Sequence, residues 1–396
     1  MKRAIPFLIT LFCVHNACTQ TFTNFKKSDG LGADGINAIA IDLLGNKWFG
    51  TVNGGVTKFD GITWTNYTTK NGLVDNLIYS LASDKNGAIW IGTNTGASMF
   101  DGEKWTTFGE KEGISYVTSL AIDAADNKWF GTVNGVFKYD GAKWITYTKA
   151  DGLVHNCVLS MAFEKNGTKW FCTPSGVSSF DGTNWKTYTT KDGLPSDRVY
   201  GVAIDSKGNK WFGTLGKGLT KFDGSNWTTY TMADGMISDY LWALTIDKQD
   251  NLWIASSNNG ISRFNGEKFE NYDLKNGLVG NNTHAIVLEN NSTVWIGTFT
   301  GLSKLCIGTT DDLQRPTADH DFLIYPNPTN NRIHLKIDDL LINSKVSILT
   351  IGGKLMITTV LKTNLNEIDL SSFNPGTYVV VLSTPKGIIN KKVIKL

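Results

Sequence analysis

Histidines that share one face of the expected fold are the first candidates for chemistry in this chain. The sequence has five histidines, and the repeat pattern described below places His155 and His284 on the same face. Two histidines could serve as the general acid and general base of a lyase. No carboxylate stands at a fixed spacing to orient them, so ordinary surface-loop histidines are the alternative interpretation.

Carboxylates on the same face offer a second kind of chemistry. A glycosidase needs two carboxylates about 5–10 Å apart, and the candidates are Asp34, Asp75, Asp197 and Asp239. Three of them share one repeat position, and other units place an amide there: Asp34, Asp197 and Asp239 against Asn76, Asn156 and Asn281. A position that accepts either Asp or Asn favours loop capping over catalysis.

Other catalytic and metal-binding patterns are missing from the sequence. It contains no nucleophile elbow, phosphate-binding loop, paired-cysteine metal site or zincin helix. Cys157, Cys172 and Cys306 have no regular spacing, which predicts neither a disulfide framework nor a metal site. Cys172 stands where other units have Gly or Ala, so we expect it to be small and buried. We therefore expect no metal and no cofactor.

Positions that vary between otherwise similar units are the candidates for ligand binding. One lies seven residues past a recurring Gly, allowing for a two-residue deletion in the third unit: Asn37, Tyr79, Thr118, Leu159, Tyr200, Trp242 and His284. A second lies in the turns after the WxGT segments: Asn53, Asn94, Asn134, Ser175, Lys217, Asn258 and Thr300. Amides and hydroxyls beside aromatic rings suit a neutral sugar. The alternative is that Asn in these turns only supports left-handed backbone geometry.

Two cations in one unit offer an acidic ligand instead. Arg198 and Lys217 lie on the same expected face and could hold the carboxylate or sulfate of an acidic polysaccharide. Asp197 is adjacent, so a solvated charge cluster explains them equally well.

A repeated tryptophan indicates the strands that must position these residues. Trp48, Trp90, Trp129, Trp170, Trp211, Trp253 and Trp295 follow one another at intervals of 42, 39, 41, 41, 42 and 42 residues. This period is typical of a propeller or a repeat array. The unit at 72–108 has four β-rich runs separated by Gly, Asn and Asp turns: Leu77–Ser83, Ile89–Thr93, Ala97–Phe100 and Trp105–Phe108. We therefore expect seven four-stranded antiparallel sheets.

The last sheet needs a strand from the other end of the chain. Fourth-strand aromatics recur six times, at Trp64, Trp105, Trp144, Trp185, Trp227 and Phe269. The pattern Thr21–Phe25 matches that strand, whereas the unit around Trp295 stops near Cys306 after three strands. Pairing the two closes a ring without exposed sheet edges. In such a ring the fourth-to-first-strand connections and the second-to-third-strand turns share one face.

The segments GLVDNLIYSLASDKNGAIWIGT and GLPSDRVYGVAIDSKGNKWFGT resemble the two-component regulator propeller repeat, and the resemblance covers residues 21–306. That family supplies the periplasmic sensor portion of hybrid histidine kinases and also occurs in stand-alone secreted proteins. We expect no kinase or transmembrane helix here, so only a binding scaffold is implied. The function we expect is non-catalytic binding of an extracellular glycan or protein. The alternative, by similarity to seven-bladed streptogramin lyases, is a lyase or hydrolase acting on a polysaccharide or cyclic ester.

The C-terminal part is a different domain. Residues 307–321 are polar and rich in breakers, which predicts a linker, and alternating apolar residues in 322–396 predict a small β-sandwich. The string Tyr325-Pro326-Asn327-Pro328, then LSSFNPGTYVVVL at 370–382 and the terminal KKVIKL, resemble the sorting domain of type IX secretion cargo from Bacteroidetes-type bacteria. The resemblance implies a partner, the outer-membrane translocon, and a secreted or cell-surface location. An adhesive sandwich is the alternative.

The remaining features agree with export. Residues 1–20 have the charged start, apolar run and small or polar end of a signal peptide, with cleavage expected between Ala17 and Gln20; Cys18 leaves a lipoprotein as an alternative. A formal charge of +2 without a basic run gives no reason to expect nucleic acid. No segment reaches the roughly 18 apolar residues of a membrane-spanning helix. We expect a monomer.

Overall fold

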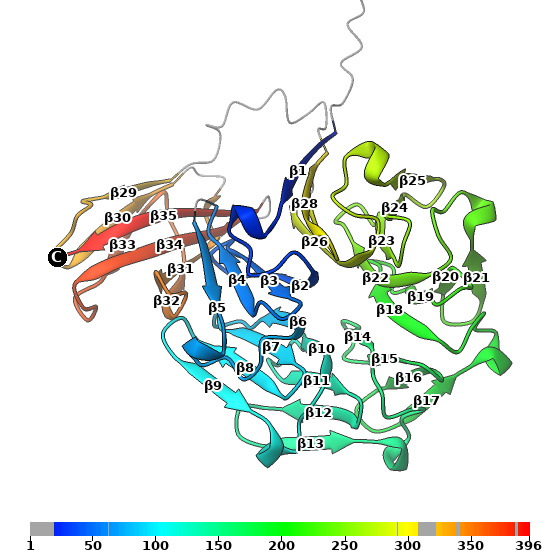
Figure 1. Cartoon of the computed structure of the whole chain (residues 1–396). Coiled ribbons are helices and arrows are strands. Elements are labelled where there is room, and N and C mark those ends of the chain that lie inside the picture. The colour runs from blue at the N-terminus through cyan, green and yellow to red at the C-terminus, as the bar shows by residue number, and fades with distance from the viewer. Residues whose placement is uncertain (1–19, 62, 291, 308–321, 338–340, 385–386) are drawn as a thin grey trace, which may run out of the picture.

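The protein is an all-β molecule with a ring of seven sheets and a smaller C-terminal pair of sheets (Figure 1). The structure, a computed structural model, describes all residues except 1–19, 62, 291, 308–321, 338–340 and 385–386. The expected signal peptide and nearly all of the expected linker therefore lie outside the described residues.

Each sheet of the ring is a blade of four antiparallel strands. Blade 1 holds β2 (Ile36–Ile41), β3 (Lys47–Thr51), β4 (Val56–Phe59) and β5 (Trp64–Tyr67), and blade 2 holds β6 (Ile78–Ser83), β7 (Ile89–Thr93), β8 (Ala97–Phe100) and β9 (Trp105–Phe108). Blade 3 holds β10 (Val117–Ile122), β11 (Lys128–Thr132), β12 (Gly135–Tyr139) and β13 (Trp144–Tyr147), and blade 4 holds β14 (Ser160–Phe163), β15 (Lys169–Thr173), β16 (Gly176–Phe180) and β17 (Trp185–Tyr188). Blade 5 holds β18 (Val199–Ile204), β19 (Lys210–Thr214), β20 (Leu219–Phe222) and β21 (Trp227–Tyr230), and blade 6 holds β22 (Leu241–Ile246), β23 (Leu252–Ser256), β24 (Ile261–Phe264) and β25 (Phe269–Tyr272). Blade 7 holds β26 (Thr283–Asn290), β27 (Thr293–Thr298), β28 (Gly301–Cys306) and β1 (Thr21–Phe25).

The N-terminal strand closes the ring, as the sequence predicts. Strand β1 pairs antiparallel with β28, and Phe22 lies opposite Leu305. Ser303 Oγ donates to Asn24 Oδ1 across this pair at 2.6 Å, and the same bond joins Thr57 to Asn66 in blade 1. The two ends of the ring are therefore joined by the same contacts that hold an uninterrupted blade together.

The repeated tryptophans lie between the blades, and an acidic residue six positions earlier fixes each indole. In blade 1 Trp48 is 1% exposed and its Nε1 donates to Asp42 Oδ2 at 2.8 Å. The same bond recurs in each blade, with acceptors Asp84, Asp123, Glu164, Asp205, Asp247 and Glu289. Because a buried indole N–H needs a partner, this spacing explains why the turn between the first two strands begins with an acid.

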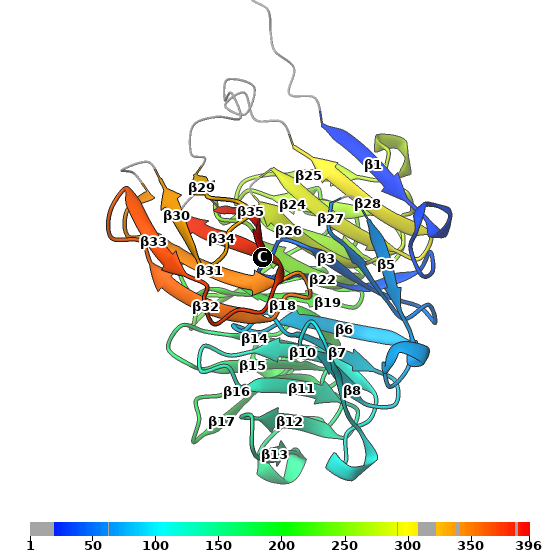
Figure 2. The same cartoon turned by 90° about the vertical axis from the view of Figure 1, so that its left-hand side faces the viewer.

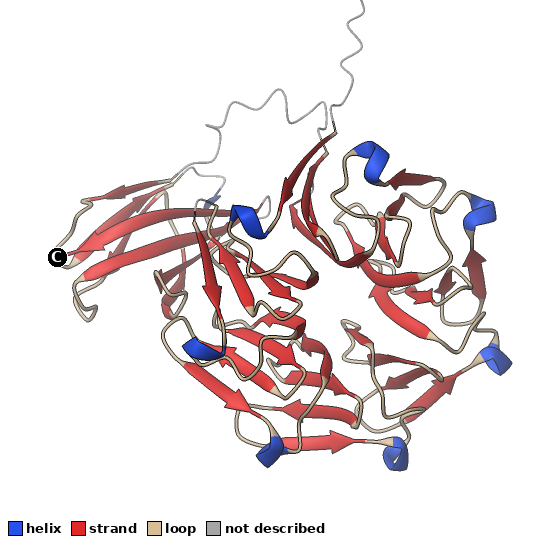
Figure 3. Cartoon of the chain, in the orientation of Figure 1, coloured by secondary structure: helices blue, strands red, loops and turns tan. Residues whose placement is uncertain are grey.

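Seven short 3₁₀ turns lie on the outer rim, where each fourth strand hands over to the next blade (Figure 3). They span Lys27–Asp29, Thr69–Asn71, Glu110–Glu112, Lys149–Asp151, Thr190–Asp192, Met232–Asp234 and Leu274–Asn276. A glycine with positive φ ends each turn, and a Cβ on Gly72 (φ 111°) would lie only 2.9 Å from Trp105 Cβ. The recurring Gly is thus favoured in every turn by its backbone conformation, and at Gly72 also by this close approach.

The C-terminal region is a two-sheet sandwich. One sheet contains β29 (Leu323–Tyr325), β30 (Arg332–Lys336) and β33 (Leu365–Asp369); the other contains β31 (Lys345–Thr350), β32 (Leu355–Val360), β34 (Gly376–Thr384) and β35 (Gly387–Lys395). Ile333, Val346, Ile368 and Val380 from the two sheets share one apolar core. Figure 2 shows these sheets lying against the side of the ring formed by the first blades.

Candidate functional site

The variable position seven residues past each Gly coincides with a β-bulge. In blade 1 the pairing of β2 with β3 joins Ile36 to Thr51 and Ala38 to Gly50, so Asn37 is skipped. The same register shift skips Tyr79, Thr118, Tyr200, Trp242 and His284. In blade 4 Leu159 directly precedes β14, and its N–H donates to Cys172 O. A bulge turns one side chain away from the regular alternation of the strand, which explains how these residues leave the packed sheet.

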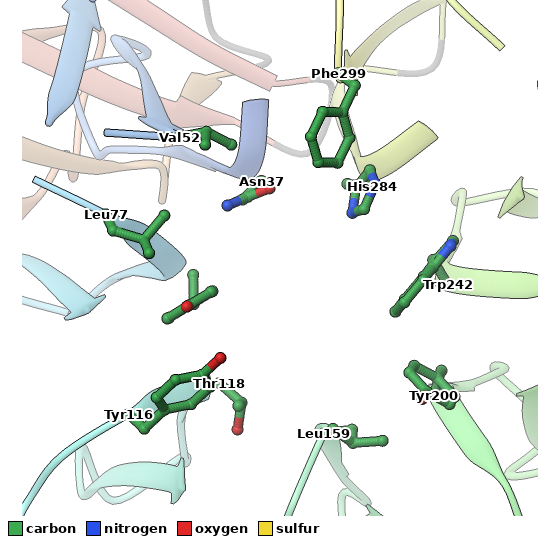
Figure 4. A pocket seen from close by; sticks show the side chains of 11 residues that line it. Asn37, Val52, Leu77, Tyr116, Thr118, Leu159, Tyr200, Trp242, His284 and Phe299 are labelled. Carbon is green, nitrogen blue, oxygen red and sulfur yellow. The ribbon is translucent and has the colours of Figure 1, made fainter. Parts of the chain in front are cut away.

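All seven of these side chains line one cavity at the mouth of the central channel (Figure 4). The cavity has a volume of about 480 Å³, and its other lining residues are Val52, Leu77, Tyr116 and Phe299. A smaller cavity of about 200 Å³ shares Thr118 and His284 with it and is otherwise lined by inner-strand residues, among them Ala38, Ser80, Ser119, Ala243 and Ala285. The mouth therefore holds a larger volume than this second cavity.

Aromatic rings form one continuous wall of the mouth. Tyr200 meets Trp242 edge-on at 4.7 Å between ring centroids, and Trp242 stacks on His284 at 5.3 Å. His284 in turn meets Phe299 at 4.8 Å. Figure 4 shows these four rings following one another along one side of an open centre, with Leu77 on the other side. Such a wall offers a large, preformed apolar surface.

Two tyrosines form a separate pair across the mouth. Tyr79 stacks on Tyr116 at 5.0 Å, and burial, a hydrogen bond with Tyr116 and nearby charge hold the pKa of Tyr79 well above its usual value. Tyr116 has φ 51°, a conformation that non-glycine residues seldom adopt. Tyr116 directly precedes the first paired residue of its blade, as Leu77 does in blade 2, and both side chains line the mouth.

The polar members of the ring are committed to neighbouring blades. Asn37 Nδ2 donates to Ile78 O at 2.9 Å, and Thr118 Oγ1 donates to Val158 O and to Gly131 O. The bonds to Ile78 and Val158 join blade 1 to blade 2 and blade 3 to blade 4, whereas the bond to Gly131 lies within blade 3. Asn37 and Thr118 therefore have less capacity left for a ligand than their residue types indicate.

His284 is the histidine among the residues that line the mouth. Burial lowers its pKa, so the imidazole is neutral at neutral pH. Its Nε2 lies 2.9 Å from Asn282 Oδ1, and when Nε2 carries the proton, Nδ1 is left as an acceptor. His155 is not among the residues that line the mouth; its Nδ1 accepts the N–H of Cys157 at 3.0 Å. The structure thus does not bring the two histidines into one cavity.

The turn residues expected to bind a ligand lie outside the mouth. Asn53, Asn134 and Asn258 are exposed and Asn94 is half-buried, and none of them lines the cavity. Asn53 has φ 63°, so it adopts the left-handed conformation that was the alternative interpretation of these asparagines. The other three do not have a positive φ. The chain reaches the mouth one residue earlier, at Val52 in blade 1 and Phe299 in blade 7.

The two cations also lie away from the cavity. Arg198 and Lys217 are both exposed and do not line it. Arg198 directly precedes the first strand of its blade, as Leu77 and Tyr116 do in theirs, but unlike them it does not line the cavity.

The Asp/Asn position caps the 3₁₀ turns. Asp34 Oδ1 accepts the N–H of Lys27 at 2.6 Å, and Asn76 Oδ1 accepts that of Thr69 at 2.9 Å. The equivalent bonds are made by Asn156, Asp197, Asp239 and Asn281. Asp75 accepts the N–H of Leu77. These carboxylates thus accept backbone N–H groups and stabilise the loops.

Sequence reasoning missed Val52, Leu77, Tyr116 and Phe299. The sequence does contain a signal for them. Leu77 and Tyr116 directly precede the first paired residue of a bulged strand, and Val52 and Phe299 directly follow the Thr that ends a WxGT segment. Both positions vary between units. The pattern does not show which of the seven equivalents turn inward, because that depends on the local connection.

Comparisons with known proteins agree with both parts of the fold. The model of the secretion system C-terminal sorting domain matches residues 323–396, and that of the two component regulator propeller matches residues 72–95. The chain therefore carries this propeller repeat and a sorting domain that indicates export by type IX secretion to the cell surface or outside. No curated protein matches the chain. In the described residues no helix is long and apolar enough to cross a membrane.

Solved structures show the same fold at low identity. The extracellular domain of the hybrid two component system BT3049 from B. thetaiotaomicron matches with 19% identity and a TM-score of 0.65, covering 95% of this chain and 57% of that one. PorZ, a surface component of the type-IX secretion system of Porphyromonas gingivalis, matches with 18% identity and a TM-score of 0.59, covering 92% and 60%. A catalytically inactive virginiamycin B lyase from Staphylococcus aureus, with quinupristin, matches with 13% identity and a TM-score of 0.61, covering 73% and 99%. The chain thus spans less than two thirds of the length of the first two structures.

Proposed function

We propose that this exported propeller binds an uncharged extracellular ligand, a glycan or a peptide segment, in the channel mouth and does not turn it over. Residues 21–306 form the binding domain in this proposal, and residues 322–396 are the address read by the type IX translocon. The main support for this proposal is the ring of bulged residues, because in six blades a β-bulge places a side chain in the lining of the same cavity.

The lining supports an uncharged ligand with a broad apolar face. The cavity is lined by aromatic, aliphatic, amide and hydroxyl side chains and by the neutral His284, without an acidic side chain, Lys or Arg among them. An acidic polysaccharide would need paired cations, and Arg198 and Lys217 are not in the mouth. Sugar rings and hydrophobic peptide side chains both present C–H surfaces to aromatic walls.

Trp242 adds a second argument. Its Nε1 is buried without a hydrogen-bond partner among the described residues, and Figure 4 shows that atom at the end of the ring away from the centre of the cavity. An unpaired buried N–H costs about 1–3 kcal/mol. Leu159 fills the equivalent place in blade 4 without that cost. The ring of Trp242, rather than its N–H, is therefore the part that a ligand in the mouth would contact.

A lyase is the second candidate, and His284 is the observation that favours it. The imidazole is neutral, lies at the cavity wall and has a partner that orients it, as a general base requires. Virginiamycin B lyase shares the propeller fold. Binding without turnover remains the better proposal, because the second histidine of the predicted pair, His155, is not in the mouth.

The test is a screen of the secreted protein against uncharged glycans and peptides, followed by Trp242→Ala. Loss of the largest ring of the wall should weaken binding about tenfold to a hundredfold, since burying such a side chain is worth about 1.5–3 kcal/mol. Tyr240→Ala is the matched control, because Tyr240 is 54% exposed beside Trp242 and does not line the cavity. Equal affinity of the parent and Trp242→Ala would place the site elsewhere. Product formation that His284→Gln abolishes would favour the lyase.

A further inference from the structure

The turn between the first two strands differs in blade 1 from its equivalents. Blade 1 has Leu43-Leu44 at the tip, whereas the tips of the next five blades are Lys85-Asn86, Ala124-Ala125, Lys165-Asn166, Ser206-Lys207 and Lys248-Gln249. All ten of those residues are exposed. Leu44 is only 7% exposed, although it lies in a turn on the outside of the propeller. Something therefore covers this one turn.

The cover is the C-terminal sandwich. Leu44 forms an apolar cluster with Leu349 and Val381, and Leu43, Leu355 and Val379 pack against it. Leu349 and Val381 are 0% and 2% exposed, although they belong to the face of their sheet that is turned away from the core of the sandwich. Asn390 Nδ2 also donates to Leu44 O at 2.8 Å. Sheet β32-β31-β34-β35 thus buries its outer face against the propeller.

Two pairs of glycines let the backbones of the two domains approach closely. The β31–β32 turn reaches blade 2, where a Cβ on Gly352 would lie 1.9 Å from Gly102 O, and a Cβ on Gly87 would lie 2.7 Å from Gly353 O. The glycines equivalent to Gly102 in blades 1, 3, 4, 5 and 6, namely Gly61, Gly141, Gly182, Gly224 and Gly266, have no atom within 4 Å of such a Cβ among the described residues. Backbones approach this closely only where neither side carries a side chain.

We propose that blades 1 and 2 carry a docking site for the chain's own sorting domain. The site is formed by Leu43-Leu44, Gly87 and Gly102. It holds the sorting domain in one fixed orientation relative to the propeller. The site lies at the strand ends opposite the mouth, because it uses turns between first and second strands and, at Gly102, the turn between the third and fourth strands, whereas the mouth uses the starts of the first strands. The docked domain leaves the ligand entrance open.

The ion pair at the edge of this contact serves as a reporter. Lys354 Nζ lies 3.6 Å from Glu103 Oε2, and both side chains are half exposed. Such a pair adds little stability, but a carbodiimide joins a carboxylate to an amine in direct contact without a spacer. The full-length protein should therefore yield a Glu103–Lys354 crosslink, found by mass spectrometry of its peptides, in an amount that does not depend on protein concentration.

Two variants test whether the site holds the domain. Gly352→Ala places a methyl group against Gly102, and it does not strain its own turn, since Gly352 does not have a positive φ. Leu43→Lys with Leu44→Asn copies the tip of blade 2, a turn that already folds in this chain. We expect the crosslink in both to fall to the background seen in Lys354→Ala. Ile351→Ala, an exposed position in the same turn, should keep the parent's yield.

Three outcomes would overturn the proposal. The first is an undiminished crosslink in Gly352→Ala or in the double variant, and the second is no crosslink in a parent whose circular dichroism shows a folded protein. The third is a crosslink yield that rises with protein concentration, because a second copy of the chain would then occupy the site. Unchanged melting of the propeller in each variant separates lost docking from lost folding.

Discussion

At the scale of single residues, His284 connects burial to a measurable pH dependence. Burial lowers its pKa because the charged form loses hydration in the mouth, and its two ring contacts, Trp242 and Phe299, cannot replace that water. A ligand packed on the neutral ring should therefore bind with constant affinity from pH 8 down to the ordinary histidine pKa of about 6.5, and lose affinity only at lower pH. Isothermal titration across this range checks it, with His284→Asn as a control that should flatten the acid side. Affinity that already falls between pH 8 and pH 7 would mean that His284 is charged in the free protein or does not meet the ligand.

Residue identity alone gave only part of the mouth. The seven variable residues could be selected from the sequence because the repeat defines their position, and all seven line the cavity. The turn asparagines could not be judged in the same way. Val52 lines the cavity and its neighbour Asn53, with φ 63°, does not, and this choice depends on the backbone conformation of the turn, which the repeat pattern does not show.

At the scale of elements, the closing strand is the part whose removal tests the ring. Deleting residues 21–27 leaves β28 as an unpaired edge and removes Phe25, which stacks on Trp295 at 5.8 Å and meets Trp64 in a tilted arrangement at 5.3 Å. We expect a sharply lower unfolding temperature, since the variant loses both a ladder of backbone hydrogen bonds and an aromatic contact between blades 7 and 1. Thermal unfolding followed by tryptophan fluorescence measures it. Asn24→Ala, which removes only the two side-chain bonds of Asn24, from Ser303 Oγ and to Gly277 O, should cause a smaller decrease of the same sign. An unchanged melt after the deletion would contradict closure by this strand.

Elements were the most predictable level of this structure, and the reason is periodicity. The unit at 72–108 gave strands at 77–83, 89–93, 97–100 and 105–108, and the structure has Ile78–Ser83 with the other three unchanged. Seven copies of one pattern fix strand ends because the turn glycines and the acid six residues before each Trp recur in each unit. The bulges were not predicted, since a skipped residue changes pairing without changing the apolar pattern.

The whole molecule keeps its two proposed contacts at opposite ends of the same strands. The mouth uses the start of β2, and the docking site uses the turn that follows its end. The position of the sandwich could not be read from the sequence beforehand, because Leu43-Leu44 stands out only when it is compared with the equivalent turns and a partner surface is known. Contact with the sandwich explains the apolar tip of this blade 1 turn, which the repeat pattern alone does not explain.

This separation predicts that ligand binding and docking are energetically independent. Changes at distant sites without shared partners usually add without coupling, and the described contacts of Leu44 and Gly352 include no residue that lines the mouth. Gly352→Ala should therefore bind the ligand with the parent's affinity, and Trp242→Ala should keep the Glu103–Lys354 crosslink. The double variant should show both defects at the size of the single ones, measured by titration and by crosslink yield on the same samples. A shift of affinity in Gly352→Ala would show instead that the blades transmit the position of the sorting domain through the rigid sheets to the mouth, and the propeller would then report whether its C-terminal domain is docked.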